Sequence, residues 1–172
     1  MNKWPKPDYA SLCEAFGKFD LNDRGLPTPQ WERSFLCTVD LPYPMRLSWE
    51  RETIVRKTTV NQAVRTAFLN CMDGILKHYG SIQKVREAGM DLWGGCYCFR
   101  RARGLGIPSV HSWAAAVDLD PDRNELGKKW EPNKGMMPEP VIDIFKASGA
   151  IWGGDWKNRP DTMHFQWTQP YK

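Results

Sequence analysis

The spacing of apolar residues changes along this 172-residue chain, and that change most narrows the folds that it can adopt. In residues 60–79, apolar side chains recur every three or four positions, which predicts one amphipathic helix. In residues 163–167, Met163, Phe165 and Trp167 alternate with two polar residues, the period of a half-buried strand. Helices followed by a small sheet, with one more helix inserted, predict an α+β fold.

The remaining elements follow from shorter patterns. Further helices are expected at residues 9–16, 81–88 and 138–148, and short strands within residues 90–100 and 109–120. For the helix in residues 60–79, Thr59 or Asn61 can cap the start, and Gly80 can end it. We expect one domain over residues 1–172, with residues 1–60 as an N-terminal elaboration on a core of residues 61–172.

Composition argues against several classes of protein. The net charge of +4 comes without a basic stripe, so we expect no nucleic-acid partner. No run of about 18 apolar residues occurs, so no membrane insertion is expected. The opening MNKWPKPDYASL lacks the apolar segment of a secretory signal, which predicts synthesis in the cytoplasm. Five cysteines without spaced CxxC pairs predict reduced thiols rather than a disulfide framework.

Histidine is rare, and two of the three imidazoles fall in expected strands. His111 precedes Asp118 by seven residues in SVHSWAAAVDLD (residues 109–120), and His164 lies in the last expected strand. Imidazole and carboxylate are the usual ligands of a catalytic zinc ion, which takes three protein ligands and keeps one position open. From spacing alone, we favour a hydrogen-bonded pair of His111 and Asp118 in the core, and a metal site is the alternative. His78 would complement the dipole at the end of its helix.

The same sequence offers further polar candidates. Val117 and Leu119 alternate with Asp118 and Asp120, so a strand would place both carboxylates on one face. Asp161 can act as a general base or as a turn cap in NRPDT, and turn chemistry favours the cap. Three arginines lie close together before the first histidine stretch, and spacing does not choose among them: Arg100, Arg101 and Arg103.

Three segments resemble, in the same order, the signatures of one enzyme family. GGCYCFRRARG resembles G-x-Y-x-x-R, SVHSWAAAVDLD resembles S-x-H-x-x-G-x-A-x-D, and IWGGDWKNRPDTMHFQW resembles an aromatic-W-G-G-x-W segment followed by D-x-M-H-F. These signatures mark D-alanyl-D-alanine carboxypeptidases and related L-alanyl-D-glutamate endopeptidases, which include phage endolysins. The resemblance covers residues 90–167.

The resemblance implies a fold and a set of roles. It implies an α+β fold in which a small antiparallel sheet, flanked by helices, carries a Zn²⁺ ion. Asp161 would be the general base and acid, Arg100 would hold a substrate carbonyl or carboxylate, and Ser109 would lie near the substrate. The zinc ligands would be His111, Asp118 and His164. Ala114 departs from the signature, which usually has glycine there, and glycine often marks a positive φ or a close approach.

The resemblance also implies what the protein does. It would hydrolyse a peptide bond of the peptidoglycan stem peptide, L-alanyl-D-glutamate or D-Ala-D-Ala, most simply as a monomeric phage-type lysis enzyme. Without a secretory signal, it would reach the cell wall after release through a pore made by another protein. A cytosolic dipeptidase is the nearest alternative. The other is a non-catalytic peptide- or wall-binding module on the same fold, although such modules usually lose a ligand or the base. Trp4, Trp31 and Trp49 would pack in the core or contact substrate.

Overall fold

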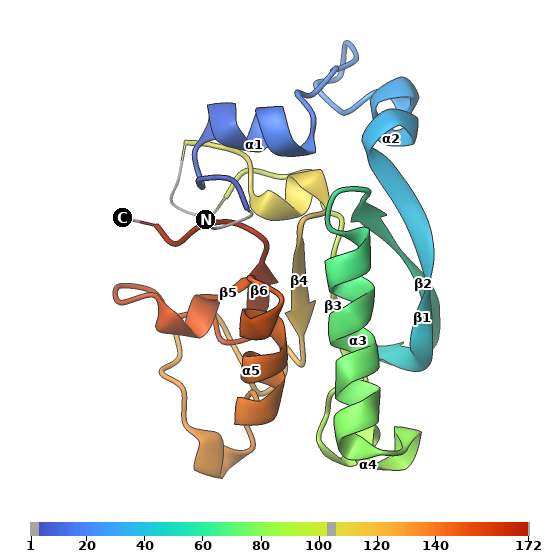
Figure 1. Ribbon diagram of the computed structural model, residues 1–172, viewed down its shortest axis with the longest axis vertical. Coiled ribbons are helices and arrows are strands. Elements are labelled where there is room, and N and C mark those ends of the chain that lie inside the picture. The colour runs from blue at the N-terminus through green and yellow to red at the C-terminus, as the bar shows by residue number, and fades with distance from the viewer. Residues whose placement is uncertain (1–3, 103–105, 172) are drawn as a thin grey trace.

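A six-stranded sheet with helices against it forms the centre of the molecule, which we describe from a computed structural model covering residues 4–102 and 106–171 (Figure 1). The strand order is β2-β1-β3-β4-β6-β5, and the β1–β3 pair is parallel whereas the other pairs are antiparallel. The strands are β1 (Leu36–Leu47), β2 (Glu50–Asn61), β3 (Leu92–Gly95), β4 (Ala116–Leu119), β5 (Ile151–Trp152) and β6 (His164–Gln166). The predicted α+β class is confirmed.

Four of the five described α-helices overlap predicted helices, whereas α2 was not predicted. The α-helices are α1 (Tyr9–Phe16), α2 (Pro29–Phe35), α3 (Arg65–Tyr79), α4 (Ile82–Glu87) and α5 (Glu139–Ala147). Three 3-10 helices are η1 (Val110–Trp113), η2 (Pro132–Lys134) and η3 (Gly153–Asp155). Helices α3 and α5 contact each other on one face of the sheet, and α1 lies across one end (Figure 1). Within the described residues, no helix combines the length and the apolar character needed to cross a bilayer.

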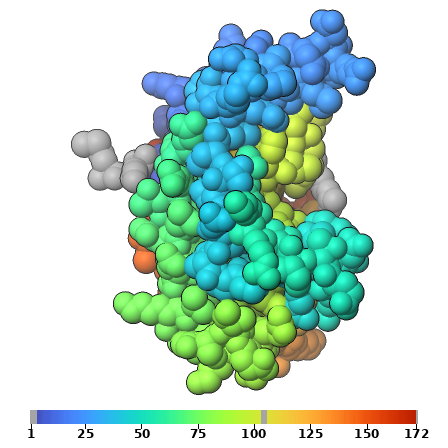
Figure 2. Space-filling model, turned by 90° about the vertical axis from the view of Figure 1, so that its right-hand side faces the viewer, coloured from blue at the N-terminus to red at the C-terminus, as the bar shows by residue number. Residues whose placement is uncertain are grey.

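A long hairpin of β1 and β2 opens the sheet, and the sequence patterns did not predict it. Its strands pair from Leu36 with Asn61 to Leu47 with Glu50, with irregular register between these ends. Figure 2 shows the hairpin along one side of the molecule, with the blue N-terminal segments above it. β1 joins the rest of the sheet through its parallel pairing with β3. Residues 36–61, mostly within the expected N-terminal elaboration, therefore form an integral edge of the sheet; the boundary at residue 60 stays a prediction.

Helix α3 starts later than its apolar pattern predicted. Residues 60 and 61 still belong to β2, and the helix starts only at Arg65. Val64 is its N-cap residue, and the Val64 side chain makes no capping hydrogen bond. Neither predicted residue is the N-cap: Asn61 accepts from the Ala63 N–H through Oδ1 in the turn before the helix, and its side-chain amide donates to the carbonyls of Phe16 and Trp113. Gly80 ends the helix as predicted, in a left-handed conformation with φ of 75°.

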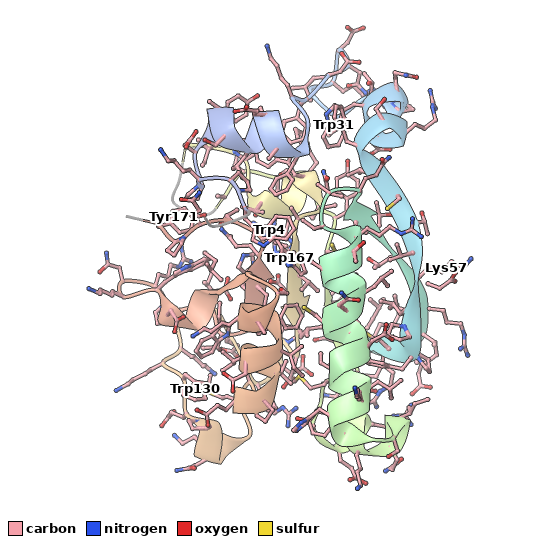
Figure 3. The ribbon with its side chains drawn as sticks, in the orientation of Figure 1. Trp4, Trp31, Lys57, Trp130, Trp167 and Tyr171 are labelled. Carbon is pink, nitrogen blue, oxygen red and sulfur yellow. The ribbon has the colours of Figure 1, made fainter. Side chains whose placement is uncertain are left out.

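Aromatic residues fill the core between the sheet and the helices. The rings of Phe145 on α5 and Phe165 on β6 stack with centroids 4.1 Å apart. Trp4 and Trp31 are 5% and 2% exposed, so both pack in the core, as Figure 3 shows for their side chains. Trp49, at 69% exposure, lies at the tip of the hairpin. All five cysteines are free thiols.

Candidate metal centre

The two central strands place a histidine beside an aspartate. In the antiparallel β4–β6 pair, Asp118 lies directly opposite His164. Because successive side chains on a strand point to opposite faces, and Phe165 packs against α5, the neighbouring His164 points to the other face of the sheet. The alternation predicted for residues 163–167 therefore places His164 on the face that carries the site.

The third member of the cluster comes from a helix. His111 lies on the 3-10 helix η1, so its assignment to a strand was wrong. Ser109 begins this helix, and its hydroxyl accepts from the His111 backbone N–H at 3.4 Å. The chain turns back at the end of η1, so His111 reaches the other two residues although they lie in strands.

Three ligand atoms meet at one point. His164 Nδ1 lies 2.9 Å from Asp118 Oδ1, His111 Nε2 lies 3.2 Å from the same oxygen, and the two nitrogens are 3.1 Å apart. A tetrahedral zinc ion with bonds of about 2.0–2.1 Å separates its ligand atoms by about 3.3 Å. The observed triangle is close to one face of that tetrahedron, and the three residues form a set able to hold a metal ion.

In both histidines, the ring nitrogen that points away from the cluster is hydrogen-bonded, and this bond sets the protonation of the nitrogen that points into the cluster. His111 Nδ1 donates to the Cys96 carbonyl at 2.7 Å, and His164 Nε2 donates to Gln166 Oε1 at 2.9 Å. The Gln166 amide donates in turn to Thr168 Oγ1. In the neutral imidazoles, both inward nitrogens therefore carry lone pairs, as metal ligands do. Two nitrogen lone pairs and a carboxylate that face one another repel, so a cation between them would stabilise the arrangement.

The charge of the cluster suits a divalent ion. Asp118 is largely buried, which opposes ionisation, but the positive charge of the His111 and His164 imidazoles, when they are protonated without a metal between them, holds the pKa of its carboxyl well below its usual range. The carboxylate is therefore ionised at neutral pH. One carboxylate and two neutral imidazoles would leave a bound Zn²⁺ with a net charge of +1, so the ion would keep its Lewis acidity.

Asp161 lies next to this cluster with an unused oxygen. Its backbone N–H donates to Gly153, and its carbonyl accepts from the His164 N–H at 3.1 Å. Its Oδ1 is buried and has no hydrogen-bond partner in the described part of the chain. Burial raises the pKa of the Asp161 carboxyl, although the His164 imidazole opposes the rise. A side chain that only capped the turn would use its oxygens on backbone N–H groups, and Asp161 Oδ1 is not used in this way.

Two glycines bring the site carboxylates into place. A Cβ on Gly153 would lie 2.5 Å from the Asp161 carbonyl oxygen and 3.0 Å from its Cβ. A Cβ on Gly94 would lie 2.8 Å from the Asp118 Cβ. Sequence reasoning used the glycine pairs of GGCYC and WGGDW only as parts of signatures. Their physical role is to let the backbones of Asp118 and Asp161 come close.

Ala114 adopts the conformation for which the signature keeps glycine. Its φ and ψ are 53° and 34°, in the left-handed region, and its N–H donates to the His111 carbonyl at the end of η1. Ala114 is fully buried and is not among the described residues that line the cleft. The alanine therefore adds backbone strain and does not narrow the cleft.

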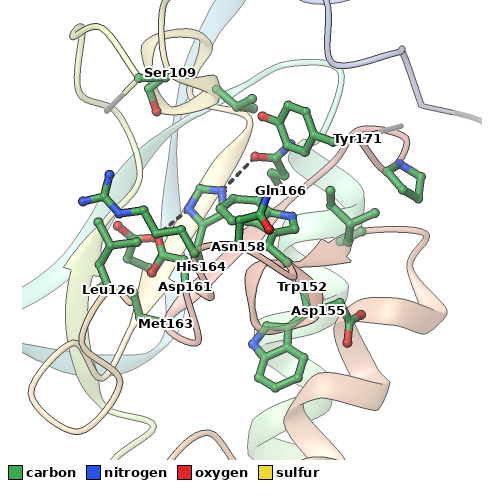
Figure 4. A pocket seen from close by; sticks show the side chains of 18 of the residues that line it. Ser109, Leu126, Trp152, Asp155, Asn158, Asp161, Met163, His164, Gln166 and Tyr171 are labelled. Atoms are coloured by element: carbon green, nitrogen blue, oxygen red, sulfur yellow. Dashed lines mark hydrogen bonds and ion pairs between the residues drawn. The ribbon is translucent and has the colours of Figure 1, made fainter. Parts of the chain in front are cut away.

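A cleft of about 1090 Å³ opens over the cluster (Figure 4). Asp118, His164 and Asp161 line it. Arg100 and Ser109 also line it, and the Arg100 guanidinium acts electrostatically on Asp161.

The other polar residues that the sequence analysis singled out lie away from the cleft or outside the described residues. Arg101 pairs with Pro108 in an isolated bridge and is not in the described lining, and Arg103 lies outside the described residues. Asp120 does not share the face of Asp118: it leaves the strand with φ of 48° and binds Arg123 at 2.6 Å. His78 is exposed in the last turn of α3.

Among the cleft residues that sequence reasoning missed, two aromatic and two basic residues matter most for binding. The rings of Trp156 and His164 have centroids 5.4 Å apart, and Tyr171 packs on Trp156. Lys157 and Arg159 add two exposed cations to the lining. The WGGDWKNRP signature contains three of these residues, but spacing along an irregular loop does not show which side chains face a cleft.

Comparison with known proteins bears on this site. No solved structure matches the chain. A family model described as D-alanyl-D-alanine carboxypeptidase, for a family of zinc peptidases, matches residues 103–167. That stretch holds the whole metal cluster and Asp161, and it is thus the part of the chain that is similar to D-alanyl-D-alanine carboxypeptidases.

Proposed function

We propose that the protein is a zinc metallopeptidase that hydrolyses a peptide bond of the peptidoglycan stem peptide, either L-alanyl-D-glutamate or D-Ala-D-Ala, as a phage-type cell-wall lysis enzyme. One observation carries the proposal. Two imidazoles, each with its outward nitrogen bound to an oxygen acceptor, and one carboxylate converge on a point beside a second buried carboxylate that has an unpartnered oxygen, and three of these four residues line an open cleft. The family match over the same residues supports it.

The cluster supplies the metal and its chemistry. His111, Asp118 and His164 would hold the ion through the three converging atoms. When bound, zinc supplies Lewis acidity, which makes water a nucleophile near neutral pH and polarises a carbonyl group. The hydrogen bonds from the outward nitrogens to Cys96 and Gln166 keep both rings oriented, so little rearrangement is needed for binding.

Asp161 and Arg100 perform the remaining steps. Asp161 takes a proton from the attacking water on its free oxygen and then passes it to the departing amine. Burial raises the pKa of the Asp161 carboxyl, which favours its holding the proton between the two transfers. Arg100, on the cleft wall, stabilises the negative charge that develops on the substrate carbonyl oxygen.

The cleft suits an acidic peptide. Lys157 and Arg159 line it, and neither forms an ion pair with any described residue. Stem peptides carry free carboxylates, which these cations would attract. The cleft is also open to solvent along residues 155–159, which are mostly exposed. A polymer-bound peptide would thus have access after the protein is released to the wall.

The test uses two carboxylate variants on the same cleft. Asp161→Asn removes the proton acceptor but keeps the shape, so hydrolysis of defined muropeptides should fall by about 10³-fold or more while zinc stays bound. Asp155→Asn is the control, because Asp155 also lines the cleft but is exposed and paired with Lys146 at 2.8 Å. Mass spectrometry of the products identifies the bond. Equal turnover by both variants would refute the role of Asp161.

A further inference from the structure

We infer that Thr168–Tyr171, the segment after β6, forms a wall of the cleft, and that Tyr171 contacts the bound peptide beside the scissile bond. This inference rests on the proposed peptidase function. The segment lies beyond residues 103–167, which the family model matches, so the match assigns no role to it. Three observations carry the inference: the place of Tyr171, the aromatic pair that it forms, and the anchor that holds its segment.

Tyr171 borders the metal cluster. It lines the same cleft as His164 and Asp161, and in Figure 4 its ring lies beside Gln166, on the side of the cleft away from Leu126 and Met163. The side chain of Gln166 interacts with the Tyr171 phenol and also binds His164 Nε2. The phenol is therefore one side chain away from a predicted metal ligand. Its residue is 41% exposed, which leaves ring surface open to a ligand.

Tyr171 and Trp156 form an aromatic corner. Their ring centroids are 5.6 Å apart with an interplanar angle of 85°, the edge-to-face geometry that aromatic pairs favour. Trp156 extends the corner to His164, with 5.4 Å between ring centroids. The two rings, set at right angles to each other, present apolar surface to the cleft beside the metal cluster. Such a surface suits a small apolar side chain, such as the alanine methyl group of a stem peptide.

The segment is anchored at a distance from the cleft. The Gln169 backbone N–H donates to the Pro5 carbonyl at 2.8 Å, and the Gln169 amide donates to the Trp4 carbonyl at 3.0 Å. Trp4 is itself buried and donates to the Ser148 carbonyl. Residues 4 and 5 thus hold the segment against the core. Removing the Gln169 side chain should loosen Tyr171 without touching the cleft.

The experiment separates binding from chemistry with three variants and one control. Tyr171→Ala should raise KM for a defined muropeptide about tenfold, with kcat changed less than about threefold, because the corner contacts the substrate and not the reacting atoms. Gln169→Ala should raise KM in the same direction by a smaller factor, and Tyr171→Phe, which keeps the ring, should recover most of the affinity. Tyr9→Ala is the control: Tyr9 is also 41% exposed but is not in the described lining of the cleft.

Metal content and folding are measured for every variant. Zinc stoichiometry should stay at the wild-type value, which shows that any change in KM does not come from a lost ion. KM values for Tyr171→Ala and Gln169→Ala equal to that of Tyr9→Ala would overturn the inference and leave the peptidase function intact. A wild-type protein that cleaves no wall peptide would refute the peptidase function, and the inference with it.

Discussion

Replacing Gly153 with alanine tests whether the position of Asp161 sets the rate. The new Cβ would lie 2.5 Å from the Asp161 carbonyl oxygen, whereas ordinary contact begins at 3.4 Å. The Asp161 backbone must therefore move by about 0.9 Å, the difference between these distances. A misplacement of about 1 Å in a catalytic group costs about 10²-fold in rate. We therefore expect kcat to fall about 10²-fold.

The variant needs a control and two further measurements. Gly106→Ala is the matched change, because a Cβ there meets no atom of the described residues within 4 Å, so kcat should stay within about twofold of wild type. Overpacking at Gly153 should also lower the free energy of unfolding by about 1–3 kcal/mol, which thermal denaturation would detect. Zinc content is measured as well, because the displaced Asp161 carbonyl also accepts from the His164 N–H, and a wild-type zinc content shows that a loss of kcat does not come from a lost ion. A folded, zinc-loaded Gly153→Ala protein with wild-type kcat would refute the positioning role.

Three further substitutions test the metal cluster and its surroundings. Gly94→Ala would place a Cβ 2.8 Å from that of Asp118, so zinc affinity, measured by competition with a chromophoric chelator, should fall at least about tenfold; unchanged affinity would contradict the close approach. Gln166→Ala removes the acceptor for His164 Nε2 and should weaken zinc binding by about 10–100-fold in the same assay. Ala114→Gly relieves left-handed strain of about 1–2 kcal/mol but loses a buried methyl group and gains unfolded-state entropy. Its free energy of unfolding, from denaturant titration, should therefore change by less than about 1 kcal/mol, and a tenfold loss of activity would show that the methyl group reaches the site.

Apolar residues that recur every two positions, or every three to four positions, predicted much of the fold. The alternation around Phe165 placed His164 on the correct face, because one buried face fixes the direction of every side chain along a strand. Left-handed glycines such as Gly80 marked helix ends for an equally local reason. The β2 strand was missed because most of it is exposed, and a strand without a buried face has no strong apolar period, whereas β1 buries Val39, Leu41, Tyr43 and Met45 in alternation, a pattern that the sequence analysis did not use.

Such spacing patterns predicted less of the candidate site. His111 lies on a 3-10 helix, so its approach to Asp118 depends on a turn at Ala114 that periodicity does not show. Likewise, Tyr171 reaches the cleft through hydrogen bonds from Gln169 to residues about 165 positions earlier in the chain. The resemblance to a family predicted the cluster because it carries information on tertiary contacts, which spacing along one chain does not contain.

Metal-dependent cleavage of a defined muropeptide tests the central claim most directly. The protein is stripped with a chelator, assayed by mass spectrometry of the products, and assayed again after one equivalent of zinc is restored. We expect cleavage at a single stem-peptide bond that disappears on stripping and returns with zinc, and no recovery for His164→Ala, which lacks one of the three converging ligand atoms. Cleavage that survives complete removal of the metal, or full zinc binding and activity in His164→Ala, would contradict the claim.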